Sequence, residues 1–154
     1  MQQTNEHKNY LALMQRLEQL HEFNWIDEDN GQLEAEVRPA VDFPCALISF
    51  QYPNFSNLDN AGKLQQGPVQ IVVQMGFTNS TDTNHLAPSY ARDQALSYKN
   101  IINEANKAIH NWKLPAGGKS RITRVSQLRR VREDGIVIIE VVYNTTVLDD
   151  SLSE

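Results

Sequence analysis

The side chains that could do chemistry in this chain are few and scattered. No two histidines show the spacing of metal ligands, and the four present are His7, His21, His85 and His110. The single cysteine, Cys45, has the apolar neighbours Phe43, Ala46 and Leu47, which predict a buried side chain and not a reactive thiol. Nucleophilic catalysis requires a Ser, Cys or Thr beside a placed base, and the chain has no Gly-x-Ser-x-Gly turn. The residue types therefore predict no enzyme, no cofactor and no metal site.

One glycine-rich stretch imitates part of a phosphate-binding loop. Residues Gly117-Gly118-Lys119-Ser120 match the end of a P-loop, but the first glycine of that motif is missing. A P-loop also lies between a strand and the helix that follows it, whereas here a predicted helix precedes and a predicted strand follows. We therefore expect no nucleotide site.

Charged residues are unevenly distributed along the chain. The net charge of −5 argues against a protein that binds nucleic acid through its overall charge. Basic side chains gather in residues 119–132, and acidic ones in residues 27–36 and at the carboxyl end. Two oppositely charged patches suit head-to-tail self-association, although both also fit solvated faces. The candidate subunit-interface residues are Arg124, Arg129, Arg130, Arg132, Asp27, Asp29, Glu34 and Glu36.

The basic segment is also the one candidate for nucleic-acid binding. Lys and Arg on a strand can contact phosphates, but no aromatic residue lies between Lys119 and Arg132 to stack on bases. A small nucleic-acid-binding module that uses the basic strand 119–132 is therefore the alternative, and we expect a protein partner ahead of direct nucleic-acid binding.

The elements that must position these residues are predicted by periodicity and turn chemistry. Apolar residues at helical spacing predict a helix over residues 6–22, capped by Thr4 or Asn5. A turn at 27–31 and an extended lead-in at 33–39 are expected before a strand at 44–52. Strict alternation predicts a further strand over residues 69–77.

The second half of the chain is predicted to hold a long helix and a hairpin. Helical spacing runs from about Ser89, the expected cap, to Trp112. The Asp134-Gly135 pair then predicts a hairpin between residues 119–132 and 136–147. The first of these strands has no clean apolar face, which indicates an edge strand, while the second is apolar enough for the middle of the sheet.

Together the elements predict an α+β fold with the order α-β-β-α-β-β. The mostly antiparallel sheet is expected to pack against one long helix and a shorter amino-terminal helix. A length of 154 residues suits a single domain over residues 1–154, with loose termini at 1–5 and 149–154. The first residues lack the apolar core of a signal peptide, and no run reaches membrane-spanning length, so we expect no membrane association.

This order of elements resembles the tail terminator or tail-completion proteins of tailed bacteriophages, small α+β proteins that form rings at the head-tail junction. The resemblance covers nearly the whole chain through residues 11–20, 38–50, 69–77, 91–112 and 128–147. It is a likeness of architecture, so it transfers no residue role. Two long loops, 53–67 and 78–88, depart from the family and could dock a neighbouring ring.

The resemblance implies a structural virion protein with a tail terminator, tail-completion or connector role. It implies self-association into a hexameric or twelvefold ring, with neighbouring phage tail or connector proteins as further partners. It implies no cofactor and no small-molecule substrate. The expected location is the virion, after assembly in the cytoplasm of the bacterial host.

Overall fold

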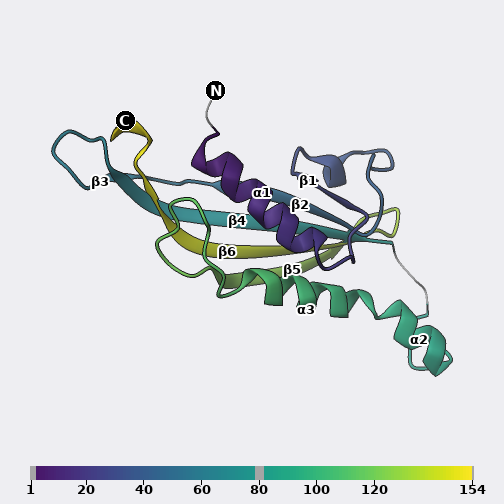
Figure 1. The fold of residues 1–154 in the computed structure, drawn as a ribbon. Helices are drawn as coiled ribbons and strands as arrows, with labels where there is room; N and C mark the ends of the chain where they lie inside the picture. Colours follow the sequence, from purple (N-terminus) through teal and green to yellow (C-terminus); the bar gives the residue numbers. More distant parts are fainter. Residues whose placement is uncertain (1–2, 79–81, 154) are drawn as a thin grey trace.

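The computed structural model describes residues 3–78 and 82–153. In this part of the chain six strands form one sheet in the order β1-β2-β4-β6-β5, with the short β3 beside β4 (Figure 1). The β1–β2 ladder is parallel and the other ladders are antiparallel. The elements are α1 Asn5–Glu18, β1 Trp25–Glu28, the 3-10 turn η1 Gln32–Glu34, β2 Cys45–Gln51, β3 Ser56–Asn57, β4 Gln65–Phe77, α2 Ser89–Ala95, α3 Tyr98–Ile109, β5 Thr123–Val131, β6 Val137–Asp149 and η2 Ser151–Ser153. The predicted α+β fold is confirmed.

The two longest strands form the centre of the sheet. β4 and β6 pair over their whole length, from Gln65 opposite Asp149 to Phe77 opposite Val137. The alternation predicted for β4 is present, because every second side chain from Val69 to Phe77 is buried in the main core. β6 lies between β4 and β5, as its apolar sequence predicts.

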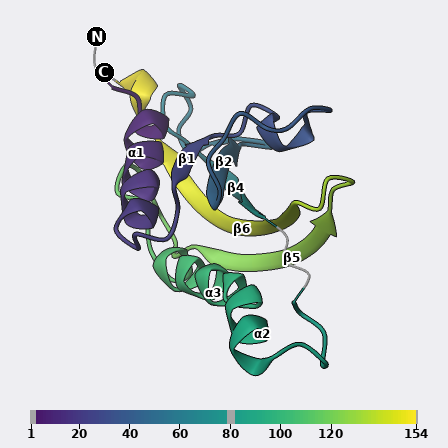
Figure 2. The ribbon, with the colours of Figure 1, turned by 90° about the vertical axis from the view of Figure 1, so that its right-hand side faces the viewer.

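Two helices cover one face of the sheet (Figure 2). Leu13 and Leu17 of α1 and Ile102 and Ile109 of α3 belong to the same buried cluster as the strand residues beneath them. Thr4 caps α1, since its hydroxyl accepts a hydrogen bond of 3.1 Å from the His7 amide. This helix-covered face holds most of the core.

The predicted long helix is interrupted. It divides into α2 and α3 at Leu96-Ser97, and it ends at Ile109 and not at Trp112. The Ser97 hydroxyl donates a 2.7 Å hydrogen bond to the Gln94 carbonyl, and a serine that bonds to the preceding turn favours a bend. α2 begins at Ser89, so Pro88 and not the expected Ser89 is its N-cap residue, and no side chain caps it. α2 buries none of its residues and lies beyond the end of the sheet in Figure 1.

The other face of the sheet is covered at one end by the segment between β1 and β2. Leu33 and Val41 of this segment form a second buried cluster with Cys45, Leu47 and Ile138. Two predictions are wrong here. Trp25–Glu28 is a strand, although a turn was expected from residue 27, and Gln32–Glu34 is a 3-10 turn where the sequence predicted an extended lead-in.

The chain ends are more ordered than the sequence predicts. Asn5 is already the first residue of α1. At the other end, Asp149 is the last residue of β6 and is paired with Gln65, and a 3-10 turn follows. Among residues 3–78 and 82–153, no helix combines the length and apolar character needed to cross a membrane.

Candidate subunit interface

The hairpin turn at Asp134-Gly135 fixes the position of the basic strand. Gly135 adopts a φ of +87°, which glycine tolerates without steric cost. Its amide donates to the Arg132 carbonyl at 2.9 Å, and the Arg132 amide donates to the Ile136 carbonyl at 2.9 Å. The predicted turn is confirmed, and it sets Arg132 opposite Ile136 at the start of the β5–β6 ladder.

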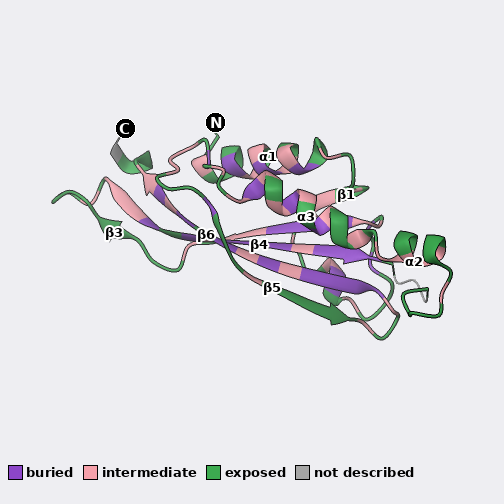
Figure 3. Ribbon diagram, turned by 90° about the horizontal axis from the view of Figure 1, so that it is seen from below, coloured by how far each residue is buried: buried purple, intermediate pink, exposed green. Residues whose placement is uncertain are grey.

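β5 is an exposed edge strand. All of its residues except Ser126 are exposed, and three of them are apolar: Val125 is 57% exposed, Leu128 63% and Val131 49%. Figure 3 shows the strand green along its length beside the largely buried β6. The predicted edge position is confirmed, and apolar side chains left in water at a sheet edge favour a partner.

The side chains of β5 divide between the two faces of the sheet. Arg129 pairs with Ile139 of the helix-side core, and its Nε donates to the Tyr98 hydroxyl at 3.3 Å. Arg130, opposite Ile138 of the second cluster, lies on the other face. An irregularity between Arg124 and Ser126 shifts the register, as a β-bulge does.

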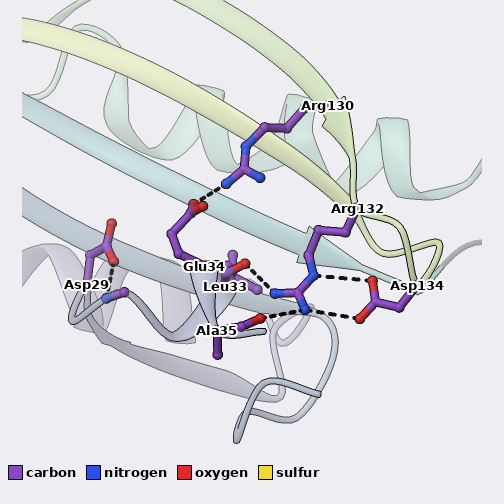
Figure 4. Close-up of polar contacts among 8 residues, drawn as sticks. Asp29, Leu33, Glu34, Ala35, Arg130, Arg132 and Asp134 are labelled. Carbon is purple, nitrogen blue, oxygen red and sulfur yellow. Dashed lines mark hydrogen bonds and ion pairs between the residues drawn. The ribbon is translucent and has the colours of Figure 1, made fainter. Parts of the chain in front are cut away.

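Two of the predicted interface arginines contact the acidic segment of their own chain (Figure 4). The Arg130 guanidinium forms an ion pair with the Glu34 carboxylate, and both side chains are about half exposed. The Arg132 guanidinium donates to the carbonyls of Leu33, of Ala35 at 2.8 Å and of Val37 at 3.3 Å. The acidic and basic regions thus meet inside one chain at this point.

Asp134 completes the attachment of Arg132. Its carboxylate lies 3.2 Å from the Arg132 guanidinium and also accepts the Ile136 amide. Desolvation raises the pKa of this carboxyl, but the hydrogen bonds from the Ile136 amide and the Arg132 side chain outweigh it, so the Asp134 pKa lies below its ordinary value. The charged form of Asp134 is therefore the one that the folded hairpin stabilises.

The other predicted acidic residues lie away from the basic strand or make local contacts. Asp27 belongs to β1, the opposite edge of the sheet, and its carboxylate accepts the Glu28 amide at 2.8 Å and Gln32 Nε2 at 3.2 Å. Asp29 accepts the Gly31 amide at 3.0 Å. Glu36 is exposed. The structure brings Glu34 to the basic strand and leaves Asp27 and Asp29 at the far edge.

Arg124, at the start of β5, is placed by a hydrogen bond to His110. The Arg124 amide donates to His110 Nδ1 at 3.1 Å, and its guanidinium donates to Gln127 Oε1 at 3.2 Å. His110 follows the last residue of α3, so this hydrogen bond links the helix end to the strand. Sequence periodicity carries no signal for such a contact between distant elements.

Neither β1 nor the role of Gln32 was predicted from the sequence. The two β-favouring residues Trp25 and Ile26 are the signal that could have indicated a strand. Gln32 Nε2 donates to the Glu28 carbonyl at 3.0 Å as well as to Asp27. The Gln32 side chain is therefore bonded to the last two residues of β1.

Neither the cysteine thiol nor the possible metal ligands form a reactive site in the described residues. Cys45 is fully buried, as predicted, and desolvation raises the pKa of its thiol to about 11. Within the described residues, no three side chains of the His, Cys, Asp or Glu type gather as a metal site would require. What the described surface does offer is an open, basic sheet edge.

Comparison with known proteins adds no relative. No protein-family model matches the chain, and a search of curated proteins finds no similar sequence.

Proposed function

We propose that this protein is a structural virion component of a tailed bacteriophage that forms a ring at the head-tail junction or the tail end. The proposal starts from the resemblance in element order, which the folded chain keeps: an amino-terminal helix, strands, two consecutive helices and a closing hairpin. In this role the chain acts by binding other proteins and carries out no reaction.

The observation that carries the proposal is the difference between the two edges of the sheet. β5 at one edge is basic and exposed, while β1 at the other contains Asp27 and Glu28. A ring needs two different, complementary surfaces on every subunit, because a head-to-tail contact repeats around the closed circle. The two edges supply such a pair of surfaces.

The mass of the purified protein in solution tests the proposal. We expect light scattering to give a multiple of the 17.5 kDa chain, and negative-stain images to show rings with a central hole. A chain that remains monomeric at high micromolar concentration, or that forms compact dimers without a hole, contradicts the proposal. Flanking genes for portal, capsid or tail-tube proteins would support the phage assignment independently.

The alternative is a nucleic-acid-binding module, and one hollow beside the basic strand favours it. This hollow has a volume of about 510 Å³, and its lining includes Gln70, Ser120, Arg121, Thr123 and Asn144. Two arginines of the segment, Arg130 and Arg132, are already bonded within the chain, which leaves fewer charges for phosphates. A filter-binding series over increasing salt separates the two functions, because phosphate contacts produce a steep loss of affinity with salt.

A further inference from the structure

Three residues of β5 direct their backbone groups out of the sheet. Arg132 and Ile136 form a hydrogen-bonded pair at the hairpin end, and in an antiparallel ladder such pairs alternate with pairs that do not bond. The amides and carbonyls of Val131, Arg129 and Gln127 therefore point away from β6. Within the described part of the chain, none of these groups has a backbone partner beyond that ladder. β5 thus presents an unpaired edge.

The outward groups of β1 can be identified in the same way. The Asp29 amide donates to the Ile48 carbonyl of β2 at 2.9 Å, so the alternate residues Asp27 and Trp25 also face β2. Ile26 and Glu28 then direct their backbone groups outward. In agreement with this, the Glu28 amide and carbonyl are bonded to the side chains of Asp27 and Gln32 and not to β2.

The strand directions decide how two copies could join. β1 and β2 are parallel, and each later step across the sheet reverses the direction. β5 therefore runs opposite to β1. When a second copy is placed beside β5 with its strands in the same directions and its helices on the same face, its β1 runs antiparallel to β5.

We propose that β5 of one copy pairs with β1 of the next copy, so that the sheet continues from subunit to subunit. The register is the one that places residues with outward backbone groups opposite one another and brings opposite charges together. In it Arg129 lies opposite Glu28 of the next copy, Arg130 opposite Asp27, and Val131 opposite Ile26. This proposal rests on the ring of the proposed function and specifies its subunit contact.

The faces of the sheet agree with this register. Ile26 and Glu28 pair with Ala46 and Ile48 of the helix-side core, which is the face that Arg129 also occupies. Asp27 pairs with Leu47 of the second cluster, on the face of Arg130. Opposite charges directly across two strands are stabilising. This register forms one such pair, Arg129 with Glu28, and one apolar pair, and it places Asp27 beside Arg130, which already has an ion pair with Glu34 of its own chain.

Other pairings of the β5 edge are disfavoured. Two β5 strands side by side would place arginines against arginines, and like charges across a ladder are destabilising. A contact between β1 and β5 of the same chain is excluded by distance, because four strand spacings of about 4.8 Å separate them. Pairing of β5 with β1 of a second copy avoids the repulsion between arginines and needs no contact across the sheet of one chain.

Disulfide cross-linking tests the register directly. The double variant Ile26→Cys with Val131→Cys keeps every charge and places the two cysteines in a hydrogen-bonded pair, whose Cα atoms are about 5.5 Å apart, within disulfide reach. Under a mild oxidant we expect a ladder of covalent multimers on a non-reducing gel. The native Cys45 is fully buried and is common to all variants.

The matched control moves one cysteine along the same strand. Ile26→Cys with Val125→Cys places the second thiol six residues away, about 20 Å along β5, so we expect no ladder. Val131→Cys alone should remain uncross-linked, and a dimer there would indicate β5–β5 pairing and overturn the proposal. Equal ladders in the matched and mismatched variants would also overturn it.

The outcomes separate this contact from the proposed function. Rings without a ladder overturn the β5–β1 pairing and leave the ring proposal intact. Filaments with a ladder support the pairing and contradict the ring. A monomeric wild-type chain overturns both.

Exchange of charges gives a second test that does not depend on cysteine chemistry. Arg129→Glu and Glu28→Arg should each weaken self-association about tenfold, and the two together should restore it. Lys113→Glu, an exposed residue outside β5 with the same charge change as Arg129→Glu, is the control and should have little effect. Folding of each variant is checked by circular dichroism, and a double variant no better than the single ones overturns the register.

Discussion

The two edges of this sheet are built in different ways. β5 is nine residues long, almost fully exposed and basic, and three of its residues have backbone groups directed into solvent. β1 is four residues long, and the outward backbone groups of Glu28 are covered by Asp27 and Gln32. Proteins commonly shorten or cover their sheet edges to prevent uncontrolled pairing. The comparison indicates that β5 is open to a partner strand as it stands, whereas β1 becomes open only when the Gln32 side chain leaves the Glu28 carbonyl.

A connection between the edges adds to this contrast. Arg132, just beyond β5, bonds to the segment that follows β1, through the carbonyls of Leu33, Ala35 and Val37. The carboxyl end of β5 is therefore fixed to the segment after β1, while the Leu128 side chain in the middle of the strand is exposed. Charge alone does not distinguish the two regions, because both contain arginines.

The largest expected effect comes from removing this connection. Arg132→Ala leaves three carbonyls without their donor, and the Arg132 side chain is 12% exposed. We expect the free energy of unfolding to fall by about 2 kcal/mol, because unsatisfied, partly buried acceptors are costly. Urea unfolding followed by circular dichroism measures the change.

The control for this variant is Arg124→Ala. Arg124 has a guanidinium contact with Gln127 on an exposed strand, so the loss should be within about 0.5 kcal/mol. Equal losses for the two variants would show that Arg132 does not anchor the edge.

A smaller effect is expected from uncovering β1. In the proposed subunit contact, Gln32 must leave the Glu28 carbonyl before a strand can pair there. Gln32→Ala removes this competition and should tighten self-association about threefold, with little change in the free energy of unfolding. Sedimentation measures the association, and Gln94→Ala on α2 is the control. Unchanged or weaker association would argue that β1 is not a pairing edge.

The smallest effect concerns pH. The folded pKa of Asp134 lies below its ordinary value of 3.8, so the unfolded chain binds the proton more readily than the folded chain. The stabilisation is therefore complete above pH 3.8 and is lost as the pH falls through the folded pKa. Wild type should be slightly more stable than Asp134→Asn at pH 7, and this difference should shrink below pH 3.8. Urea midpoints at pH 7, 5 and 3 test it, and a difference that grows in acid would contradict the assignment.

Local patterns predicted much of this fold. The Asp134-Gly135 turn, the alternation of β4 and the mixed faces of β5 were each identified from residues next to one another in the chain. Such signals are reliable because turn geometry and strand pleating depend on neighbouring residues. The fold class and the edge position of the basic strand followed from them.

Features that depend on distant residues were missed. Trp25–Glu28 becomes a strand because β2 offers a ladder beside it, and that partner lies about twenty residues further along the chain. A local feature was missed as well, because the bend at Ser97, where the hydroxyl bonds to the Gln94 carbonyl, divides what helical spacing predicted as one helix. Of the candidate site, the sequence identified the charged residues but not their pairing, since Arg130 and Glu34 are 96 positions apart.

By itself, the sequence determined the fold class, the hairpin turn and the concentration of basic side chains on one strand. The tertiary structure decided which of those side chains stay available, because it bonds Arg130 and Arg132 to the segment after β1. Within the described residues it also leaves the outward backbone groups of Gln127, Arg129 and Val131 without a backbone partner. Turns and alternation are set by adjacent residues, whereas the contacts of an edge strand are set by whichever distant segments the fold brings beside it.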